Sequence, residues 1–140
     1  MRKLVVLTLI CCVMTHASNA KDALATVKGF VTAFNEKDID GMLKLATSDI
    51  QWMSVSGQTI TSEAGDQDAL KKAMSGYFAS VPSARSEIHS IHQSGSFVFA
   101  LEQAFWTSKE VEKSQCSMAV YELEEGKIKH VWYFPAHVCS

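Results

Sequence analysis

The chain has few side chains able to do acid–base or metal chemistry, and their spacing matches no catalytic motif. His89 and His92 lie three residues apart on an expected strand, so they point to opposite faces and cannot share one compact metal site. No other group of histidine, cysteine or acidic residues completes a ligand set. The sequence therefore predicts no metal site and no cofactor, and it assigns no reaction.

The element that must position several polar side chains is residues 114–134, SQCSMAVYELEEGKIKHVWYF. This run predicts two strands joined by a tight turn at Glu125 and Gly126, because glycine tolerates positive φ between strand formers. Register counted from that turn sets Tyr121 opposite His130. We therefore interpret His130 as a hydrogen-bonded interface residue rather than a general base.

The same register divides the hairpin into two faces, both apolar over most of their length. One face carries Met118, Val120, Glu122, Lys129, Val131 and Tyr133, and the other carries Ala119, Tyr121, Leu123, Ile128, His130, Trp132 and Phe134. A sheet that is apolar on both sides must be covered on both. Helices can cover one side only, so a homodimer through the second face is expected. Glu102 and Lys129 are interpreted as members of ordinary solvated or interface charge pairs.

Hydrophobic spacing places the other elements in order along the chain. Apolar residues recur at spacings of three and four in 21–35, 39–46 and 66–81, which predicts three helices, with Asp38 as the cap of the second. Alternating or doubly apolar runs predict strands at 49–55, 58–64, 85–93 and 96–108. The expected class is α+β, with one layer of helices on a curved sheet.

The first 20 residues are predicted to be a secretory signal peptide. Arg2 and Lys3 precede an apolar run that ends at the small residues before a cleavage point after Ala20. The run is too short to span a membrane, and a lipidated cysteine at Cys11 or Cys12 remains the alternative. We expect a mature domain of residues 21–140 that is secreted or periplasmic, without stable membrane insertion.

The charge excludes one class of partner, and the cysteine content allows one disulfide. The 13 basic and 15 acidic residues give a net charge of -2 without a basic stripe, so no nucleic-acid partner is expected. The mature chain keeps Cys116 and Cys139, a pair that could form a disulfide in an oxidising compartment. The hairpin register opposes this pairing, because Cys116 falls opposite Pro135, about 13 Å of strand away from Cys139.

Three stretches of the chain carry a resemblance to a known superfamily. They are the helix junction at 35–41 within FVTAFNEKDIDGMLKLATSDIQWMSVSG, the start of the third helix at 64–70, and the last strand, GKIKHVWY, at 126–133. Together they resemble the nuclear transport factor 2-like superfamily, in its SnoaL-like and ketosteroid isomerase-like branch. The resemblance implies a cone-shaped curved antiparallel sheet covered on one face by three N-terminal helices, commonly as a homodimer.

The resemblance also implies a pocket inside the cone and says which residues line it. The expected lining is Phe30, Phe34, Trp52, Ser54, Tyr77, Gln103, Phe105 and Tyr133. Gln103 and Ser54 are its polar points. Phe30 and Ser54 occupy the places of the isomerase's oxyanion-binding tyrosine and general-base aspartate, and neither can do that work. Ketosteroid isomerase activity is therefore not expected.

Three functions remain open from the sequence. The first is a secreted SnoaL-like pocket protein that binds a small, mostly apolar ligand. The second is a lyase, isomerase or hydrolase acting on a small hydrophobic substrate, and the third is a dimeric protein-interaction module. A cavity with convergent polar groups and a strongly perturbed ionisable residue would favour an enzyme. A dry, filled cone would favour the interaction module.

Overall fold

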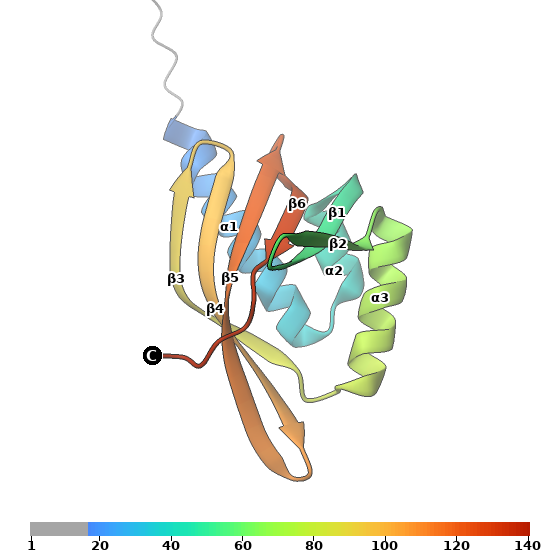
Figure 1. Ribbon diagram of the computed structural model, residues 1–140. Coiled ribbons are helices and arrows are strands. Elements are labelled where there is room, and N and C mark those ends of the chain that lie inside the picture. Colours follow the sequence, from blue (N-terminus) through green and yellow to red (C-terminus); the bar gives the residue numbers. More distant parts are fainter. Residues whose placement is uncertain (1–16) are drawn as a thin grey trace, which may run out of the picture.

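The computed structural model describes residues 17–140 as three helices and a six-stranded sheet (Figure 1). The helices are α1 (Ala17–Glu36), α2 (Ile39–Lys44) and α3 (Gln67–Ser80), and the strands are β1 (Ala46–Ser56), β2 (Thr59–Ala64), β3 (Arg85–Ser94), β4 (Phe97–Ser108), β5 (Val111–Glu124) and β6 (Lys127–Tyr133). The predicted α+β class with three N-terminal helices and a curved sheet is confirmed. Most of the predicted signal peptide, residues 1–16, lies outside the described residues.

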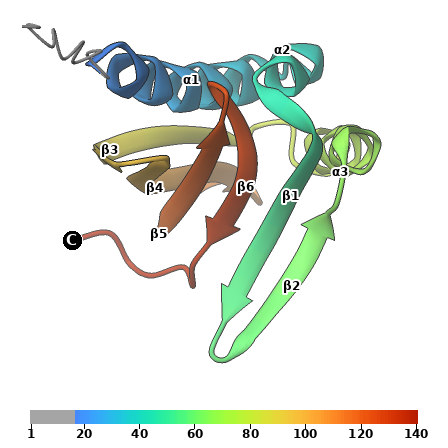
Figure 2. The same cartoon turned by 90° about the horizontal axis from the view of Figure 1, so that it is seen from above.

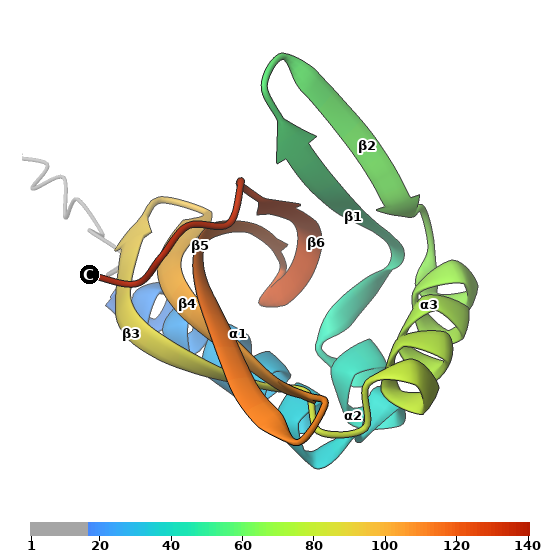
Figure 3. The same cartoon turned by 60° about the horizontal axis from the view of Figure 1, so that its bottom comes forward.

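The strands follow the order β2-β1-β6-β5-β4-β3 across the sheet. The first strand pairs in parallel with the last one, and the remaining neighbours are antiparallel. Helices α1 and α2 form a layer over one face, and α3 lies beside β1 (Figure 2). The sheet curves strongly around this face, so that β1 and β2 stand across from β4 and β5 (Figure 3).

Local capping explains where the two shorter helices begin. The Asp38 side chain accepts a hydrogen bond of 2.9 Å from the backbone N–H of Gly41, and Asp66 accepts one of 2.8 Å from Ala69. Each cap satisfies a backbone donor that the first helical turn leaves free. Within residues 17–140, no helix combines the length and the hydrophobicity that a membrane-spanning segment needs.

The β5–β6 hairpin has the predicted turn but a different register. Glu125 and Gly126 both have positive φ, 51° and 78°, as a two-residue hairpin turn of type I′ requires. Leu123 pairs with Ile128 as expected, but Glu122 then pairs with His130 because Lys129 is an extra, bulged residue. The predicted register is wrong beyond that point, since one extra residue moves every later side chain to the opposite face.

The bulge changes which side chains share a face of the hairpin. Tyr121 pairs with Val131, and both are fully buried under the helices in the same core as Ala119. The unbulged register predicts Ala119 and Tyr121 on the outer face, and this prediction is wrong. His130 does lie on the outer face, where its Nδ1 is 2.7 Å from Glu122 rather than near Tyr121.

The C-terminal tail continues from the end of β6 and runs antiparallel to β5 (Figure 1). Backbone hydrogen bonds of 2.9 and 2.8 Å join Cys116 to His137 in both directions. This pairing brings Cys139 to Cys116, and a disulfide joins the two residues. The separation that opposed this pairing shrinks because Lys129 and one residue between Tyr133 and His137 are extra to the predicted register. Cys116 therefore lies opposite His137 rather than Pro135.

Candidate functional site

A cavity of about 610 Å³ lies between the curved sheet and the helices. Its lining is largely aromatic and aliphatic, and the lining residues come from the helices, the strands and the C-terminal tail. The apolar and aromatic lining residues are Phe30, Val31, Phe34, Trp52, Val55, Ala64, Leu70, Ala73, Met74, Tyr77, Ala104, Tyr133, Phe134, Pro135 and Ala136. A cavity of this size and composition matches those that hold small organic molecules.

Aromatic rings line the cavity in two groups. The Trp52 ring stacks on Tyr133 with centroids 5.2 Å apart, and it packs against Phe30 at 5.9 Å. On the α3 side, Phe34 and Tyr77 lie 6.1 Å apart. These contacts orient the rings by packing, so that a flat apolar molecule would meet preformed surfaces.

Glu102 on β4 is the main polar group of the cavity. Its side chain is almost completely buried, at 4% exposure, yet it belongs to the cavity lining. The hydroxyl of Tyr121 donates to Oε1, whereas Tyr133 donates to Oε2 at 3.0 Å and Ser86 donates to Oε2 at 3.2 Å. One buried carboxylate thus accepts hydrogen bonds from three hydroxyls of three different strands.

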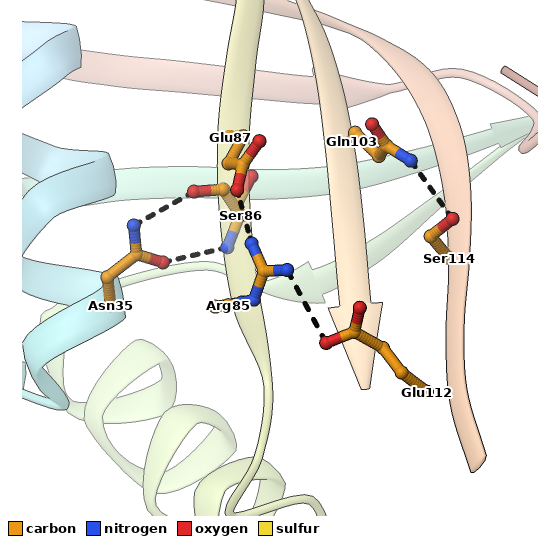
Figure 4. A network of polar contacts seen from close by, with 7 residues as sticks. All are labelled: Asn35, Arg85, Ser86, Glu87, Gln103, Glu112 and Ser114. Carbon is orange, nitrogen blue, oxygen red and sulfur yellow. Dashed lines mark hydrogen bonds and ion pairs between the residues drawn. The ribbon is translucent and has the colours of Figure 1, made fainter. Parts of the chain in front are cut away.

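Helix α1 positions the Ser86 end of this network. The Asn35 side chain accepts a hydrogen bond of 2.7 Å from the Ser86 backbone N–H and donates one of 2.8 Å to its carbonyl (Figure 4). This two-way contact ties the start of β3 to the end of the helix. Ser86 is therefore held where its hydroxyl reaches Glu102.

Burial determines the acid–base character of the three central residues. It raises the pKa of Glu102 above the ordinary value of 4.5, although the hydroxyls of Tyr121, Tyr133 and Ser86 oppose the shift. Burial raises the pKa of both tyrosines well above 10, and the negative charge of Glu102 adds to this. The phenols thus stay protonated at neutral pH and act as donors, and Glu102 can take up a proton more readily than an exposed carboxylate.

The remaining polar lining groups are more exposed or already paired. The Ser54 hydroxyl donates to Oε1 of Glu63 at 2.7 Å, and the Ser117 hydroxyl donates to the Phe134 carbonyl at 2.6 Å. The charged lining residues are Glu63 and Glu102, both acidic. In residues 17–140, no group of three or more histidine, cysteine or acidic side chains is placed to hold a metal ion.

The structure places most of the predicted pocket residues in the cavity lining. These are Phe30, Phe34, Trp52, Ser54, Tyr77 and Tyr133. Gln103 is not among them, because it lies on the opposite face of β4 and donates a hydrogen bond of 2.9 Å to Ser114 (Figure 4). Phe105 also lies on that face, under the guanidinium of Arg85 at 3.6 Å.

Sequence reasoning missed Glu102 because both faces of β4 are apolar. The interpretation of Glu102 as a solvated or interface charge is wrong, since its partners are buried hydroxyls. One feature of the sequence did indicate the inner face of β4. Glu102 shares its face of the strand with the small residues Ala100 and Ala104, while the phenylalanines lie on the opposite face. Small side chains suit the concave side of a curved strand, because side chains converge there.

Comparison with known proteins agrees with this geometry. The family of SnoaL-like domains matches residues 27–131, which is most of the chain. The chain belongs to this family. Among functionally curated proteins, no significant match to the sequence is found.

Several solved structures share the fold of this SnoaL-like domain. One is an uncharacterized cystatin fold protein from Novosphingobium aromaticivorans, with 21% identity, a TM-score of 0.69, and coverage of 81% of this chain and 97% of that one. TerC, co-crystallized with polyporic acid, has 13% identity, a TM-score of 0.69 and coverage of 80% and 89%. An epoxide hydrolase from M. tuberculosis, described as LEH-like, has 16% identity, a TM-score of 0.67 and coverage of 82% and 83%.

Phe30 and Ser54, the residues expected from the sequence at the places of the tyrosine and aspartate of ketosteroid isomerases, do not supply the acidic group of this SnoaL-like domain. Phe30, at the place of their tyrosine, packs on Trp52 and has no hydroxyl to donate. Ser54, at the place of their aspartate, donates to Glu63. The buried carboxylate comes instead from Glu102 on β4, and the phenols come from β5 and β6.

Proposed function

We propose that this SnoaL-like domain binds a small, mostly apolar molecule in the cavity between its sheet and helices. The observation that carries the proposal is Glu102, a buried carboxylate that faces a cavity otherwise lined by apolar side chains. Burying an ionisable group costs free energy even when hydroxyls satisfy it, whereas an apolar residue there would stabilise the fold at no such cost. Ionisable groups with perturbed pKa values cluster at functional sites, so a buried carboxylate in a cavity is a candidate for such a site.

The shape of the lining supports a flat ligand. Trp52 and Tyr133 both line the cavity and hold each other in place by stacking, so a planar apolar molecule can pack against this pair while a polar end reaches Glu102. A filled interior would have favoured the protein-interaction module, but the cavity leaves room for a molecule. Ligand binding is therefore the better supported of these two functions.

A second candidate function is catalysis of isomerisation, elimination or hydrolysis on such a ligand. Glu102 supports it, because burial raises its pKa toward neutral pH, where a carboxylate works best as a general base. Tyr133 lies beside it in the lining, so its ring can pack against a substrate next to the carboxylate. Steroid isomerisation is not expected, since Phe30 supplies no oxyanion donor.

Filling the cavity tests ligand binding directly. Ala73 on α3 lines the cavity, and Ala79 on the same helix is exposed outside it. Fluorescence titration with pyrenemethanol, a flat neutral alcohol, should show saturable binding to the wild-type protein and to Ala79→Phe. Ala73→Phe should lose most of this binding while its circular dichroism is unchanged. Equal binding by Ala73→Phe would overturn the proposal.

A separate measurement addresses the catalytic candidate. Acetylpyrene carries methyl protons next to a carbonyl, and a general base in the cavity would exchange them with solvent. Proton exchange in heavy water, followed by NMR, should exceed the buffer rate with wild-type protein and fall to it with Glu102→Gln. Binding of acetylpyrene without exchange would leave a ligand-binding protein and reject this general-base role.

A further inference from the structure

Resting on the proposed function, we infer that the ligand presents a hydrogen-bond donor to Glu102 and that the preferred donor is a cationic amine on a flat apolar skeleton. Three features support this ligand class: the direction of the hydrogen bonds at Glu102, the pairing of the other polar groups, and the sign of the charge in the cavity. Each is independent of the others.

The hydrogen bonds at Glu102 leave acceptors, not donors, for a ligand. A hydroxyl carries a single hydrogen atom, and those of Tyr121, Tyr133 and Ser86 are all directed at the carboxylate. An ionised carboxylate has about four lone-pair sites, so roughly one remains open. A ligand ketone or carboxylate would have to break one of these protein hydrogen bonds, whereas an N–H or O–H would complete the set.

Two other hydroxyls of the lining are also committed. The Ser54 hydrogen atom goes to Glu63 and the Ser117 hydrogen atom goes to the Phe134 carbonyl. Tyr77 and Gln115 keep donors of their own, but both are exposed side chains at which water competes. The half-buried Trp52 also carries an indole N–H, on the wall beside Tyr133. A ligand acceptor would therefore have to find its donor away from Glu102, at the Trp52 indole or at the exposed rim.

The charge of the lining favours a cation over an anion. Glu63 and Glu102 are its charged residues, and both are acidic. Lys37 lies against the Phe34 ring at 5.3 Å, but its ammonium donates to the Ala84 carbonyl and it is not part of the lining. An anion would meet like charge at low dielectric, while a cation would gain both a carboxylate and aromatic faces.

Four ligands that share one skeleton test this inference on the wild-type protein. Pyrenemethylamine is a cationic donor, pyrenemethanol a neutral donor, acetylpyrene a neutral acceptor and pyrenecarboxylic acid an anion at neutral pH. We expect affinity to fall in that order, with the amine about tenfold or more tighter than the acid, as a charge-assisted hydrogen bond implies. Fluorescence titration at neutral pH and moderate salt gives the four dissociation constants.

The series separates failure of this inference from failure of the proposed function. If pyrenemethanol binds in the cavity but the amine binds no tighter than the acid, the inference is overturned and the proposed function stands. If none of the four binds, the proposed function fails and the inference falls with it. If the ketone outranks both donors, the hydrogen-bond direction assigned at Glu102 is wrong.

Two variants and a charge-matched control test whether Glu102 causes the preference for the amine over the acid. Glu102→Gln should remove most of the difference between amine and acid, while Glu110→Gln, an exposed residue between β4 and β5, should leave the difference unchanged. Tyr133→Phe deletes a hydroxyl but keeps the carboxylate, so the amine should remain the tightest ligand. Loss of acetylpyrene binding in Tyr133→Phe would show that this hydroxyl donates to the ligand, against the inference.

Discussion

The hydroxyl oxygens of Tyr121 and Tyr133 lie 3.1 Å apart, and both hydroxyls donate to the carboxylate of Glu102. The two tyrosines come from neighbouring strands whose register is displaced by the bulged Lys129. Without that extra residue, Tyr133 would point away from Tyr121. The network inside the cavity therefore depends on an irregularity at the other end of the hairpin.

The stability of the protein should depend on the ionisation of Glu102. Burial raises its pKa above 4.5, so the folded state holds the proton more tightly than the unfolded state. The resulting stabilisation is complete below about pH 4.5 and is lost as the pH rises through the raised pKa. The free energy of unfolding of the wild type, relative to Glu102→Gln, should then fall by about 1.4 kcal/mol per unit of pKa shift.

Urea unfolding at several pH values, from about pH 4 to about pH 8, measures this difference. Gln103→Leu is the control, because Gln103 lies on the other face of the same strand and does not titrate. The free energy of unfolding of Gln103→Leu should change with pH in the same way as that of the wild type. A wild-type advantage over Glu102→Gln that grows with pH would contradict the assignment.

Removing the Tyr121 hydroxyl should destabilise the fold. Tyr121 is fully buried, and its hydroxyl is the hydrogen-bond donor to Oε1 of Glu102. Tyr121→Phe leaves that buried oxygen short of a donor, at a cost of about 1 to 3 kcal/mol in the free energy of unfolding at neutral pH. Tyr77→Phe, which alters an exposed tyrosine, should change stability much less. Equal costs for the two variants would show that the buried hydrogen bond contributes little.

The Cys116–Cys139 disulfide should stabilise both the fold and the cavity. It closes a loop with a sequence separation of 23 residues and holds a tail whose Phe134, Pro135 and Ala136 line the cavity. Cys139→Ser should lower the free energy of unfolding by about 2 to 4 kcal/mol and weaken pyrenemethanol binding. A reductant should lower both the stability and the pyrenemethanol affinity of the wild type in the same way, and it should change neither in Cys139→Ser. Two free thiols in unfolded, unreduced protein would exclude the disulfide.

We propose that the outer face of the sheet forms a homodimer. Phe99 and Met118 are each 38% exposed there, beside Trp132, which lies on the same face. Such a patch would promote aggregation if it stayed bare. Trp132→Glu should convert a dimer into a monomer or an insoluble protein, as light scattering can show, whereas Ile60→Glu, on the edge strand β2, should not. A wild-type protein that is monomeric at high concentration would contradict the proposal.

We also propose that the chain is exported and that the mature protein begins at Lys21. The basic start, the apolar run and the small residues before Ala20 motivate this prediction. Intact-mass analysis of the exported protein should show the loss of 20 residues. A retained Met1, or a lipid on Cys12, would exclude cleavage after Ala20.

The local sequence determined much of the fold. The helix beginnings follow from Asp38 and Asp66, whose side chains cap the first turn whatever the rest of the chain does. The hairpin turn follows from Glu125 and Gly126, since two consecutive residues with positive φ favour glycine. The aromatic lining at Phe30, Phe34 and Tyr77 was predictable as well, because helical spacing and the family resemblance place these side chains toward the cavity.

Only the tertiary structure decided which face of each inner strand meets the cavity. Strand β4 is apolar on both faces, so its hydrophobic pattern has no preferred phase, and Glu102 and Gln103 could exchange roles on that evidence alone. The bulge at Lys129 likewise leaves no clear local signal, yet it places Tyr121 and Tyr133 on one face. Both features are set by how the curved sheet packs against the helices, a contact between segments far apart in the chain.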